Sequence, residues 1–428
     1  MEGKKQVGQK IYDLARRLYP ICRSITGEGV RQSLRILQEY IPLEITEIQT
    51  GTKVFDWTVP KEWNIREAWI KGPNGQKIVD FAEHNLHLLN YSIPVHRQLS
   101  LEELQPHLHS LPAQPDLIPY RTSYYQENWG FCLPHRQYES LSPGNYEVYI
   151  DSSLEEGQLT YGSLLVPGQV EEEWLFSTHI CHPSLANDNL SGMGVLTHLA
   201  QALIDAKPYY SYRFLFIPGT IGAISWLAQN QEKWANIQGG LVTALLGDQG
   251  AFTYKRSRDG QAYIDKLLAH VLAQSGQPHQ LQDFIPYGYD ERQFCSPGVN
   301  LAMGHLGRTP YGQFPEYHTS ADNLDFIQVS SLQQSYELFE QIIFVLEHDH
   351  RYQNLSPFGE PQLGKRGLYS AIGGDNDRKE RQMAMLWILN LSDGQHSLLD
   401  IAQRAGIDFE RVVEMAKVLE EHDLLQQL

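Results

Sequence analysis

Apolar strand patterns alternate with helical patterns between residues 145 and 274, and this alternation restricts the possible fold more than any other feature of the chain. YEVYIDSSL and LTYGSLLVPG are the first strand candidates in this region. Three further apolar stretches, EEEWLFSTHI, YRFLFIPGT and GGLVTALLGDQG, are each followed by helical spacing, at 191–205, 221–235 and 262–274. Because such alternation is typical of α/β folds, we predict an open, mostly parallel sheet flanked by helices.

The segments on either side of this region differ from it. Residues 8–42 have helical spacing, whereas residues 46–135 are rich in strand patterns, aromatic side chains and turn signals such as PNG. We therefore predict an inserted β-rich lobe at 46–135 and an α/β domain composed of 1–45 and 136–352. The later part of that domain includes a stretch, 283–326, that we expect to be mostly loop.

The C-terminal part of the chain has its own organisation. Residues 353–377 are rich in Gly, Pro and Asn and predict a linker, and residues 378–428 predict a winged helix-turn-helix domain. Ser397 and Asp400 form a capping-box pattern at the start of one of its helices.

The second helix of this predicted domain is acidic. Segment 408–423 contains six acidic residues against two basic ones: Asp408, Glu410, Glu414, Glu420, Glu421 and Asp423 against Arg411 and Lys417. A helix that recognises DNA presents basic side chains to the phosphates. A role in docking a protein partner or in homo-oligomer formation is therefore favoured over the alternative of a transcription regulator.

Composition narrows the function classes. The formal net charge of −17 argues against nucleic-acid binding, which requires a basic surface. The four cysteines are far apart and form no CxxC pattern, as expected for a protein of the reducing cytoplasm. The N-terminal segment lacks the apolar stretch of a signal peptide, and no apolar run approaches the ~18 residues that cross a bilayer. We expect a cytoplasmic protein that does not enter a membrane.

Residues 177–192, STHICHPSLANDNLSG, join a predicted buried strand to the helix at 191–205. They place His179, Cys181, His182 and Asp188 close together in the chain. Imidazole nitrogen and carboxylate oxygen are ligands that zinc accepts readily, and α/β sheets bind ligands at the carboxyl ends of their strands. A set of hydrogen-bonded polar residues without a ligand is the alternative, but the clustering of donor types favours a metal or catalytic site.

Three later segments could complete such a site. Asp248 follows the apolar stretch GGLVTALLG, where a simple turn aspartate is the alternative. The loop FPEYHTSADNLDFI carries His318 among other functional side chains, and the loop GYDERQFCSPG carries adjacent charges that could equally form a solvated turn. The candidates in these two loops are Glu316, Tyr317, Thr319, Asp290, Glu291 and Arg292.

The predicted lobe contains many aromatic residues, most of which we expect in its own core. If part of the lobe faces the cleft, it would act as a lid that restricts the substrate. Arg121 and His96 are our candidates for polar contacts from the lid to a substrate.

Long motifs across nearly the whole chain resemble the aminopeptidase-like proteins of the co-catalytic zinc peptidase superfamily, which includes the bacterial leucine aminopeptidase and glutamate carboxypeptidase folds. The motifs are LYPICRSITGEGVRQ, VFDWTVPKEWNIREAWI, IPYRTSYY, HICHPSLANDNLSG, DERQFCSPG and FPEYHTSADNLDF. The resemblance implies one or two zinc ions. It implies that His179 is the strand-end ligand, with His182 as the competing choice, that Asp188 bridges two metals, and that Asp248 and His318 are further ligands.

One element of the superfamily pattern is missing. The resemblance implies a general-base glutamate and a ligand glutamate after the strand FLFI, but this chain has Gly219 and Thr220 there. Glu316 or Glu291 could supply the missing carboxylate. Replacing Gly219 by Glu should raise activity if the rest of the site is intact. Arg292 and Tyr317 are candidate substrate contacts.

The resemblance implies hydrolysis of a peptide or amide bond in a small substrate, in the context of polysaccharide or secondary-metabolite biosynthesis. The alternative is a metal-binding or ligand-binding module that has lost peptidase activity.

Overall fold

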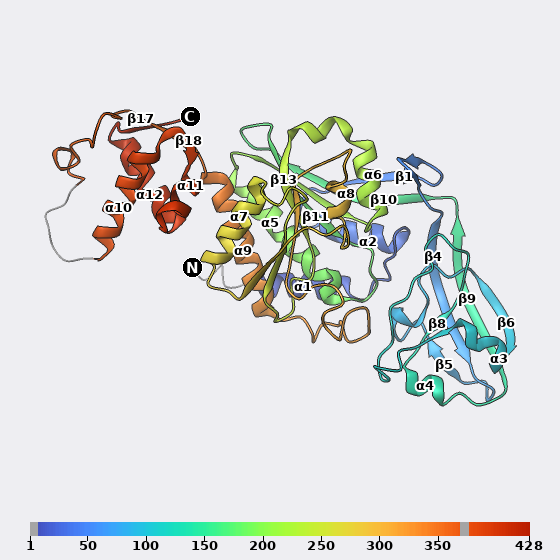
Figure 1. Cartoon of the computed structure of the whole chain (residues 1–428). Coiled ribbons are helices and arrows are strands. Elements are labelled where there is room, and N and C mark those ends of the chain that lie inside the picture. Colours follow the sequence, from blue (N-terminus) through green and yellow to red (C-terminus); the bar gives the residue numbers. More distant parts are fainter. Residues whose placement is uncertain (1–6, 369–375) are drawn as a thin grey trace. The chain divides into compact units, whose positions relative to one another are not determined.

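The computed structural model describes residues 7–368 and 376–428, which divide into two compact units (Figure 1). The first unit contains the described residues up to Asp265 together with Gln277–Glu337, and the second contains Lys266–Gly276 together with the described part of Leu338–Leu428. The candidate site residues of the sequence all fall in the first unit, and the predicted winged helix falls in the second.

An eight-stranded sheet forms the centre of the first unit. Its strands lie in the order β1 (Glu44–Gln49), β10 (Gln158–Val166), β12 (Ser211–Ile217), β11 (Glu173–His179), β13 (Ile237–Thr243), β16 (Met303–Gly307), β14 (Phe252–Lys255) and β15 (His279–Gln282). The central pairings β12–β11, β11–β13 and β13–β16 are parallel, as is β14–β15, and the other three are antiparallel. The predicted open, mostly parallel α/β sheet is confirmed.

Helices cover this sheet, so its central strands are closed off from solvent. Every residue of β11 and β12 is buried, which explains why both strands are apolar runs rather than alternating patterns. Outside the β-rich lobe, the α-helices that begin in the first unit are α1 (Val7–Leu18), α2 (Glu28–Gln38), α5 (Gly192–Ala206), α6 (Ile221–Gln229), α7 (Tyr263–Gln274), α8 (Glu291–Phe294) and α9 (Val329–His348).

Strand β16 corrects the prediction for 283–326. We expected loop there, but the stretch contains a buried central strand as well as the short helix α8. The sequence signal was weak, because MGHLG is five residues long and two of them are glycine.

The β-rich lobe has its own antiparallel sheet in the order β5 (Lys77–Asp80), β4 (Glu62–Lys71), β9 (Asn145–Glu155) and β6 (Val95–Ser100). Short elements surround it: β2 (Lys53–Val54), β3 (Trp57–Thr58), α3 (Leu101–Leu104), β7 (Leu108–His109), β8 (Phe131–Cys132) and α4 (His135–Glu139).

The predicted lobe boundaries, 46 and 135, are wrong at both ends. Strand β1 pairs with β10 in the main sheet, and β9 pairs with both β4 and β6 in the lobe. The burial of β9 alternates along the strand, so one of its faces packs on the lobe core. The lobe therefore extends through β9 to Glu155.

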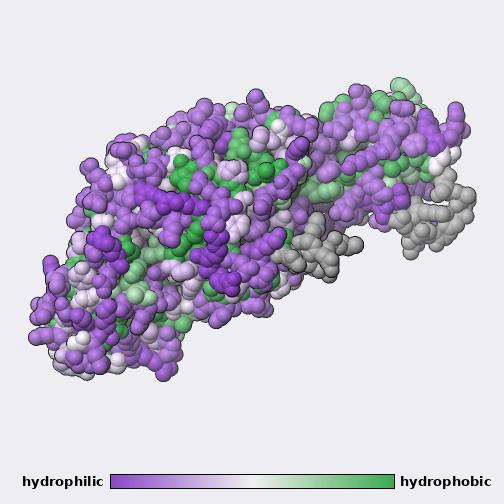
Figure 2. Space-filling model, turned by 180° about the vertical axis from the view of Figure 1, so that it is seen from behind, coloured by the Kyte–Doolittle hydropathy of each residue, from purple (hydrophilic) through white to green (hydrophobic). Residues whose placement is uncertain are grey.

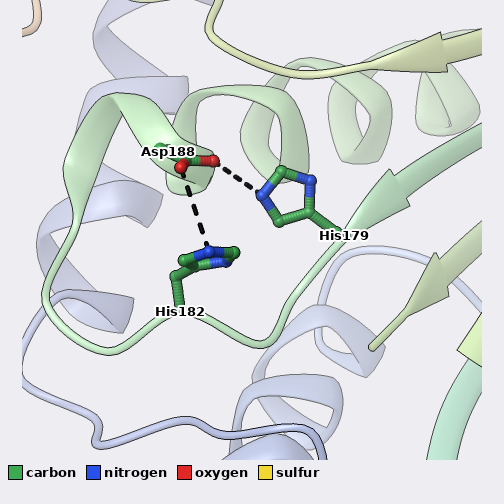
Figure 3. A group of neighbouring side chains, drawn as sticks. All are labelled: His179, His182 and Asp188. Carbon is green, nitrogen blue, oxygen red and sulfur yellow. Dashed lines mark hydrogen bonds and ion pairs between the residues drawn. The ribbon is translucent and has the colours of Figure 1, made fainter. Parts of the chain in front are cut away.

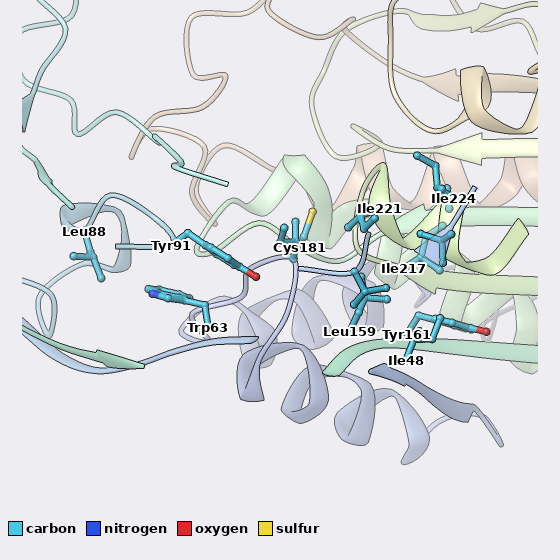
Figure 4. Close-up of a cluster of buried hydrophobic side chains, with 14 of the residues drawn as sticks. Ile48, Trp63, Leu88, Tyr91, Leu159, Tyr161, Cys181, Ile217, Ile221 and Ile224 are labelled. Atoms are coloured by element: carbon cyan, nitrogen blue, oxygen red, sulfur yellow. The ribbon is translucent and has the colours of Figure 1, made fainter. Parts of the chain in front are cut away.

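A single cluster of buried side chains runs from the lobe into the α/β part of the first unit (Figure 4). Trp63 and Tyr91 belong to the lobe end of this cluster, and Ile217 and Ile221 belong to the sheet and helix α6. Their rings and branched chains share one apolar interior, so the lobe is packed on the site region rather than tethered to it.

The second unit contains a helix-turn-helix and a three-stranded sheet. Its elements are β17 (Arg351–Asn354), α10 (Asn376–Leu391), β18 (Asp393–Ser397), α11 (Leu398–Ala405), α12 (Phe409–Glu421) and β19 (Leu425–Gln427), with β17 central in the sheet. The capping box of Ser397 and Asp400 is formed, and Gly406 ends α11 in the left-handed conformation.

This arrangement corrects the start of the predicted linker, 353–377. Strand β17 includes Gln353 and Asn354 and pairs with both β18 and β19, so the winged-helix sheet needs residues that precede 378. Part of the predicted linker, 369–375, lies outside the described residues.

The molecular face seen in Figure 2 is mostly hydrophilic, with apolar residues in small separate areas. Among the described residues, none of the helices is both long and apolar enough to span a bilayer.

Candidate metal centre

The candidate site lies at the carboxyl end of β11, the strand that pairs in parallel with both β12 and β13. His179 is the last residue of that strand. The chain then passes through 180–185 into the turn Ala186–Ser191, where Asp188 and Asn189 have non-helical backbone angles, and continues directly into α5. This path brings Asp188 back over the strand end, so the motif HICHPSLAND folds onto itself.

Three of the predicted ligands form one compact group. His179, His182 and Asp188 are buried, and one donor atom from each lies within 4.8 Å of the others (Figure 3). The Nε2 atom of His179 lies 2.7 Å from Asp188 Oδ1, and the Nε2 atom of His182 lies 3.9 Å from Asp188 Oδ2. His318 approaches from another loop, with its Nε2 3.1 Å from Asp188 Oδ2. Both histidines of HICH therefore face the same carboxylate.

The protonation states suit metal binding. Burial lowers the pKa of His182 well below its usual value, so its imidazole is neutral. Burial alone would raise the pKa of Asp188, but the neighbouring histidines, His182 first, hold it well below its usual value. Neutral imidazoles and an ionised carboxylate are the forms that bind zinc, and two nitrogens with one oxygen match the three-ligand pattern of catalytic zinc sites.

Asp322 fixes the backbone of the turn that carries Asp188. Its carboxylate accepts hydrogen bonds from the backbone N–H groups of Asn187 at 2.6 Å and of Asp188 at 2.9 Å. Asp322 is fully buried, and this burial raises its pKa to about 8. Our sequence analysis missed this residue, although it lies only four positions after His318.

Asp248 is not a member of the group of three. Its carboxylate accepts hydrogen bonds from Asn187 Nδ2 at 3.0 Å, from Gly250 N–H at 2.6 Å and from Thr309 Oγ1 at 2.7 Å. Through Asn187 it is linked to the residue next to Asp188. A role for Asp248 as a metal ligand stays a prediction.

The two positions where the resemblance implies glutamates are occupied by other parts of the chain. A Cβ atom on Gly219 would lie 2.0 Å from the hydroxyl oxygen of Tyr289. The Tyr289 ring packs on His179, with ring centroids 4.0 Å apart, and its hydroxyl lies 3.5 Å from Cys181 Sγ. The Thr220 N–H donates a 2.6 Å hydrogen bond to Asp290 Oδ1. Tyr289 and Asp290 therefore fill the side of the site that glutamates at 219 and 220 would enter.

The family described as "Domain of unknown function (DUF4910)" matches residues 12–349, and a winged helix-turn-helix family matches residues 350–427. The chain belongs to the DUF4910 family. A Clostridium acetobutylicum protein named "Putative polysaccharide biosynthesis protein with aminopeptidase-like domain" is 50% identical over 100% of this chain and 98% of its own length. The predicted C-terminal winged helix is confirmed, with its start near residue 350.

Solved structures place this DUF4910 protein beside zinc aminopeptidases in fold. A crystal structure of a "putative peptidase" from Clostridium acetobutylicum has a TM-score of 0.95 at 49% identity and covers 100% of this chain and 98% of its own. The zinc aminopeptidase BSAP from Bacillus subtilis has a TM-score of 0.58 at 12% identity, covering 80% and 95%. A peptidase M28 precursor from Shewanella amazonensis has a TM-score of 0.56 at 14% identity, covering 81% and 96%. The predicted aminopeptidase-like fold is confirmed.

Glu291 and Glu316, the two candidates for the missing carboxylate, lie in different surroundings. Glu291 is fully buried, forms a 2.5 Å ion pair with Lys255, and accepts a hydrogen bond from the Tyr289 N–H. Glu316 is half-buried in the loop before His318, and within the described part of the chain its carboxylate has no contact with the three-residue group. The base role of either residue stays a prediction.

His96 and Arg121, the two candidate lid residues, both have exposed side chains. His96 is exposed on β6 and pairs with Glu147 of the neighbouring strand at 3.0 Å. Arg121 is exposed as well. Both side chains lie on the surface of the lobe, and their polar contacts to a substrate stay a prediction. Of the other two substrate candidates, Tyr317 stacks on His318 at 3.9 Å, and Arg292 is half-buried beside Glu291.

A different part of the lobe does cover the site. The Tyr120 N–H donates a 2.8 Å hydrogen bond to the carbonyl of His318, and the Tyr120 ring lies 5.0 Å from the His318 ring and 5.1 Å from the His182 ring. Tyr120 belongs to the motif IPYRTSYY, whose length was the only sequence signal of its importance. The lobe therefore contacts the site through Tyr120, and its role as a lid that restricts the substrate stays a prediction.

Proposed function

We propose that this protein is a zinc-dependent hydrolase of a peptide or amide bond in a small substrate. The observation that carries the proposal is the buried group of His179, His182 and Asp188 at the carboxyl end of β11, with His318 on the same carboxylate. The fold is shared with BSAP, which is a zinc aminopeptidase. The name of the Clostridium acetobutylicum relative supports a substrate from polysaccharide biosynthesis.

A zinc ion at this site would polarise the carbonyl of the scissile bond. The residues of the chain supply the rest. The Nε2 atoms of His179 and His318 converge on the two oxygens of Asp188, so these side chains would hold the ion together. Tyr120 excludes water from the His318 side.

Tyr289 supplies a hydroxyl on the side of the site that lacks the glutamates. Burial raises its pKa well above the usual value, so the hydroxyl keeps its proton at neutral pH. It can donate a hydrogen bond to a substrate oxygen but cannot act as a carboxylate base. We expect one firmly bound zinc ion, and a second only if Asp248 takes part.

A binding module without hydrolytic activity is the second candidate. The observation that favours it is the space at Gly219, which Tyr289 fills, so that the usual base cannot be accommodated. General-base catalysis commonly contributes ~10²–10⁴ in rate, so its loss would leave little activity on ordinary aminoacyl substrates.

Metal titration and hydrolysis assays on the same preparation separate the two candidates. Calorimetric zinc titration of chelator-treated protein, with anomalous scattering from crystals, should place one zinc between His179, His182 and Asp188. Hydrolysis of aminoacyl amides and N-acyl amino sugars that requires zinc supports the hydrolase. Zinc binding without turnover of either class supports the binding module, and no zinc binding contradicts the hydrolase and the metal-binding form of the module.

A further inference from the structure

Arg23 is a buried arginine at the edge of the candidate site. It lies in the connection between α1 and α2, within the motif LYPICRSITGEG, and only 1% of its surface is exposed. Its Nε donates a 3.0 Å hydrogen bond to the backbone carbonyl of His182, one of the candidate zinc ligands. The side chain therefore reaches the site from a segment about 160 residues earlier in the sequence.

The guanidinium group is incompletely satisfied. Nη1 donates to the carbonyl of Leu18 at 2.6 Å, but the buried Nη2 has no hydrogen-bond partner among the described residues. Nor does any carboxylate of the described chain lie within ion-pair distance of Arg23. Two backbone carbonyls thus face a full positive charge that is removed from water.

Among the described residues of the first unit, the two other buried arginines, Arg213 and Arg308, serve as a comparison for Arg23. Arg213 forms a two-bond ion pair with Glu173, at 2.6 and 2.8 Å. Arg308 uses all three of its nitrogens, donating to Ser335, Gly250, Ser331 and Gln334. An unpaired buried charge is strongly unfavourable, and such groups are normally paired. Arg23 lacks the compensation that the fold gives to the other two.

The surroundings of Arg23 identify the side on which a partner would lie. Its Nε is held on the carbonyl of His182, the residue that follows Cys181, and the Tyr120 ring lies 5.1 Å from the His182 ring. Burial lowers the pKa of Arg23 to about 10, so it is still charged at neutral pH. All three neighbours belong to the site or to the lobe.

We propose that Arg23 binds an anionic group of the substrate, a carboxylate next to the scissile amide, on the His182 side of the site. The position of the scissile amide in this proposal is taken from the proposed function, so the proposal rests on that function. A planar guanidinium with a free nitrogen suits a carboxylate, because the two can share parallel hydrogen bonds. Substrates would then be amides of acidic building blocks, such as amino acids or acidic sugars.

Three probes with one scaffold test this assignment by calorimetric binding: N-acetylglycine, N-acetylglycinamide and N-acetylaminomethylphosphonate. They differ only in a carboxylate, a neutral amide and a phosphonate. The zinc-loaded protein should bind N-acetylglycine at least ~10-fold more tightly than the neutral amide. A phosphonate that binds more tightly than the carboxylate would assign the subsite to a phosphate group and overturn the carboxylate part of the proposal.

Two variants connect the preference to Arg23. Arg23→Gln should bind the acid and the neutral amide equally, whereas Arg23→Lys should keep a reduced preference, because it retains the charge without the planar geometry. The matched control is Arg17→Gln, which removes an exposed arginine paired with Glu39 on the same segment and should keep the full preference. If Arg23→Gln does not fold, Arg23→Lys decides. An unchanged preference in either folded Arg23 variant overturns the proposal.

Measurements on chelator-treated protein separate this inference from the proposed function. A preference for N-acetylglycine that depends on Arg23 but survives metal removal, without hydrolysis of any amide, would uphold the anion subsite and contradict the hydrolase. Zinc-dependent hydrolysis of neutral and acidic amides at equal efficiency would do the opposite.

Discussion

The turns that follow two neighbouring parallel strands, β11 and β12, differ sharply. After β11 the chain supplies His179, His182 and Asp188 in one group. After β12 it supplies Gly219 and Thr220, which contribute no carboxylate. Strands that lie side by side place their following turns at one edge of the sheet, so both turns face the same site. The candidate metal ligands and the position of the usual base thus lie on two different turns, and only the first of these turns carries its functional side chains.

The difference is built into the packing and is not a simple deletion of two side chains. Tyr289 fills the space beside Gly219, and Asp290 binds the Thr220 N–H. The loop that carries them is held by the buried pair of Glu291 and Lys255. We infer that the β12 side has been reshaped around a tyrosine, while the β11 side keeps a donor set for zinc.

The largest effect should come from the β11 side. Asp188→Asn removes the charge that balances three imidazoles and a metal, so zinc affinity should fall more than ~100-fold. Competition with a zinc chelator measures this loss. His198→Gln is the matched control, because His198 is buried in α5 but bonds only to the Gly194 carbonyl. Equal zinc affinity in Asp188→Asn and wild type would show that the group is not the zinc site.

On the β12 side, Asp290 should make stability depend on pH. Burial raises its pKa from 3.8 to about 7, so the folded state keeps a proton that the unfolded state loses near pH 4. The stability contributed by this group is complete below pH ~4 and falls as the pH rises to about 7. Between pH 5 and 8 the decrease amounts to about 2–3 kcal/mol.

Asp290→Asn cannot titrate and should lack this decrease, while its oxygen can still accept from Thr220. Urea unfolding of wild type and variant at pH 5 and pH 8 measures the difference. Parallel pH dependence in the two proteins would mean that Asp290 is already ionised in the folded state.

A glutamate at 219 tests whether Tyr289 blocks the position where the resemblance implies the general base. The sequence alone led us to expect that Gly219→Glu raises activity if the rest of the site is intact, but in the structure the new side chain meets the Tyr289 hydroxyl and must displace it. Overpacking of this kind costs about 1–3 kcal/mol in unfolding free energy. Thermal unfolding should show the loss for Gly219→Glu and a partial recovery for Gly219→Glu combined with Tyr289→Ala. A single variant as stable as wild type would contradict the steric account.

The two turns also show what sequence could and could not predict. His179, His182 and Asp188 stand within ten positions of one another, between a strong strand and a strong helix, so their convergence could be predicted locally. Tyr289, Asp322 and Arg23 reach the site from distant segments, and their roles depend on tertiary contacts that no periodicity records. The fold was predictable where strands are long and apolar, and it was missed at β16, which is short and glycine-rich.

The smallest effect should come from Glu316, which the sequence made a candidate for the missing base. Its carboxylate is half-buried and has no contact with the group of three in the part of the chain that the structure describes. Glu316→Gln should therefore change zinc affinity and any zinc-dependent amide hydrolysis by less than about threefold, since charges at partly exposed positions are well screened. Glu291→Gln is the informative comparison, because it leaves Lys255 buried without a partner and should lower stability rather than alter chemistry at the zinc. A rate that collapses in Glu316→Gln while zinc binding and unfolding stay at wild-type values would identify Glu316 as the base. The β12 side would then have lost its glutamates only to receive one from the loop of His318.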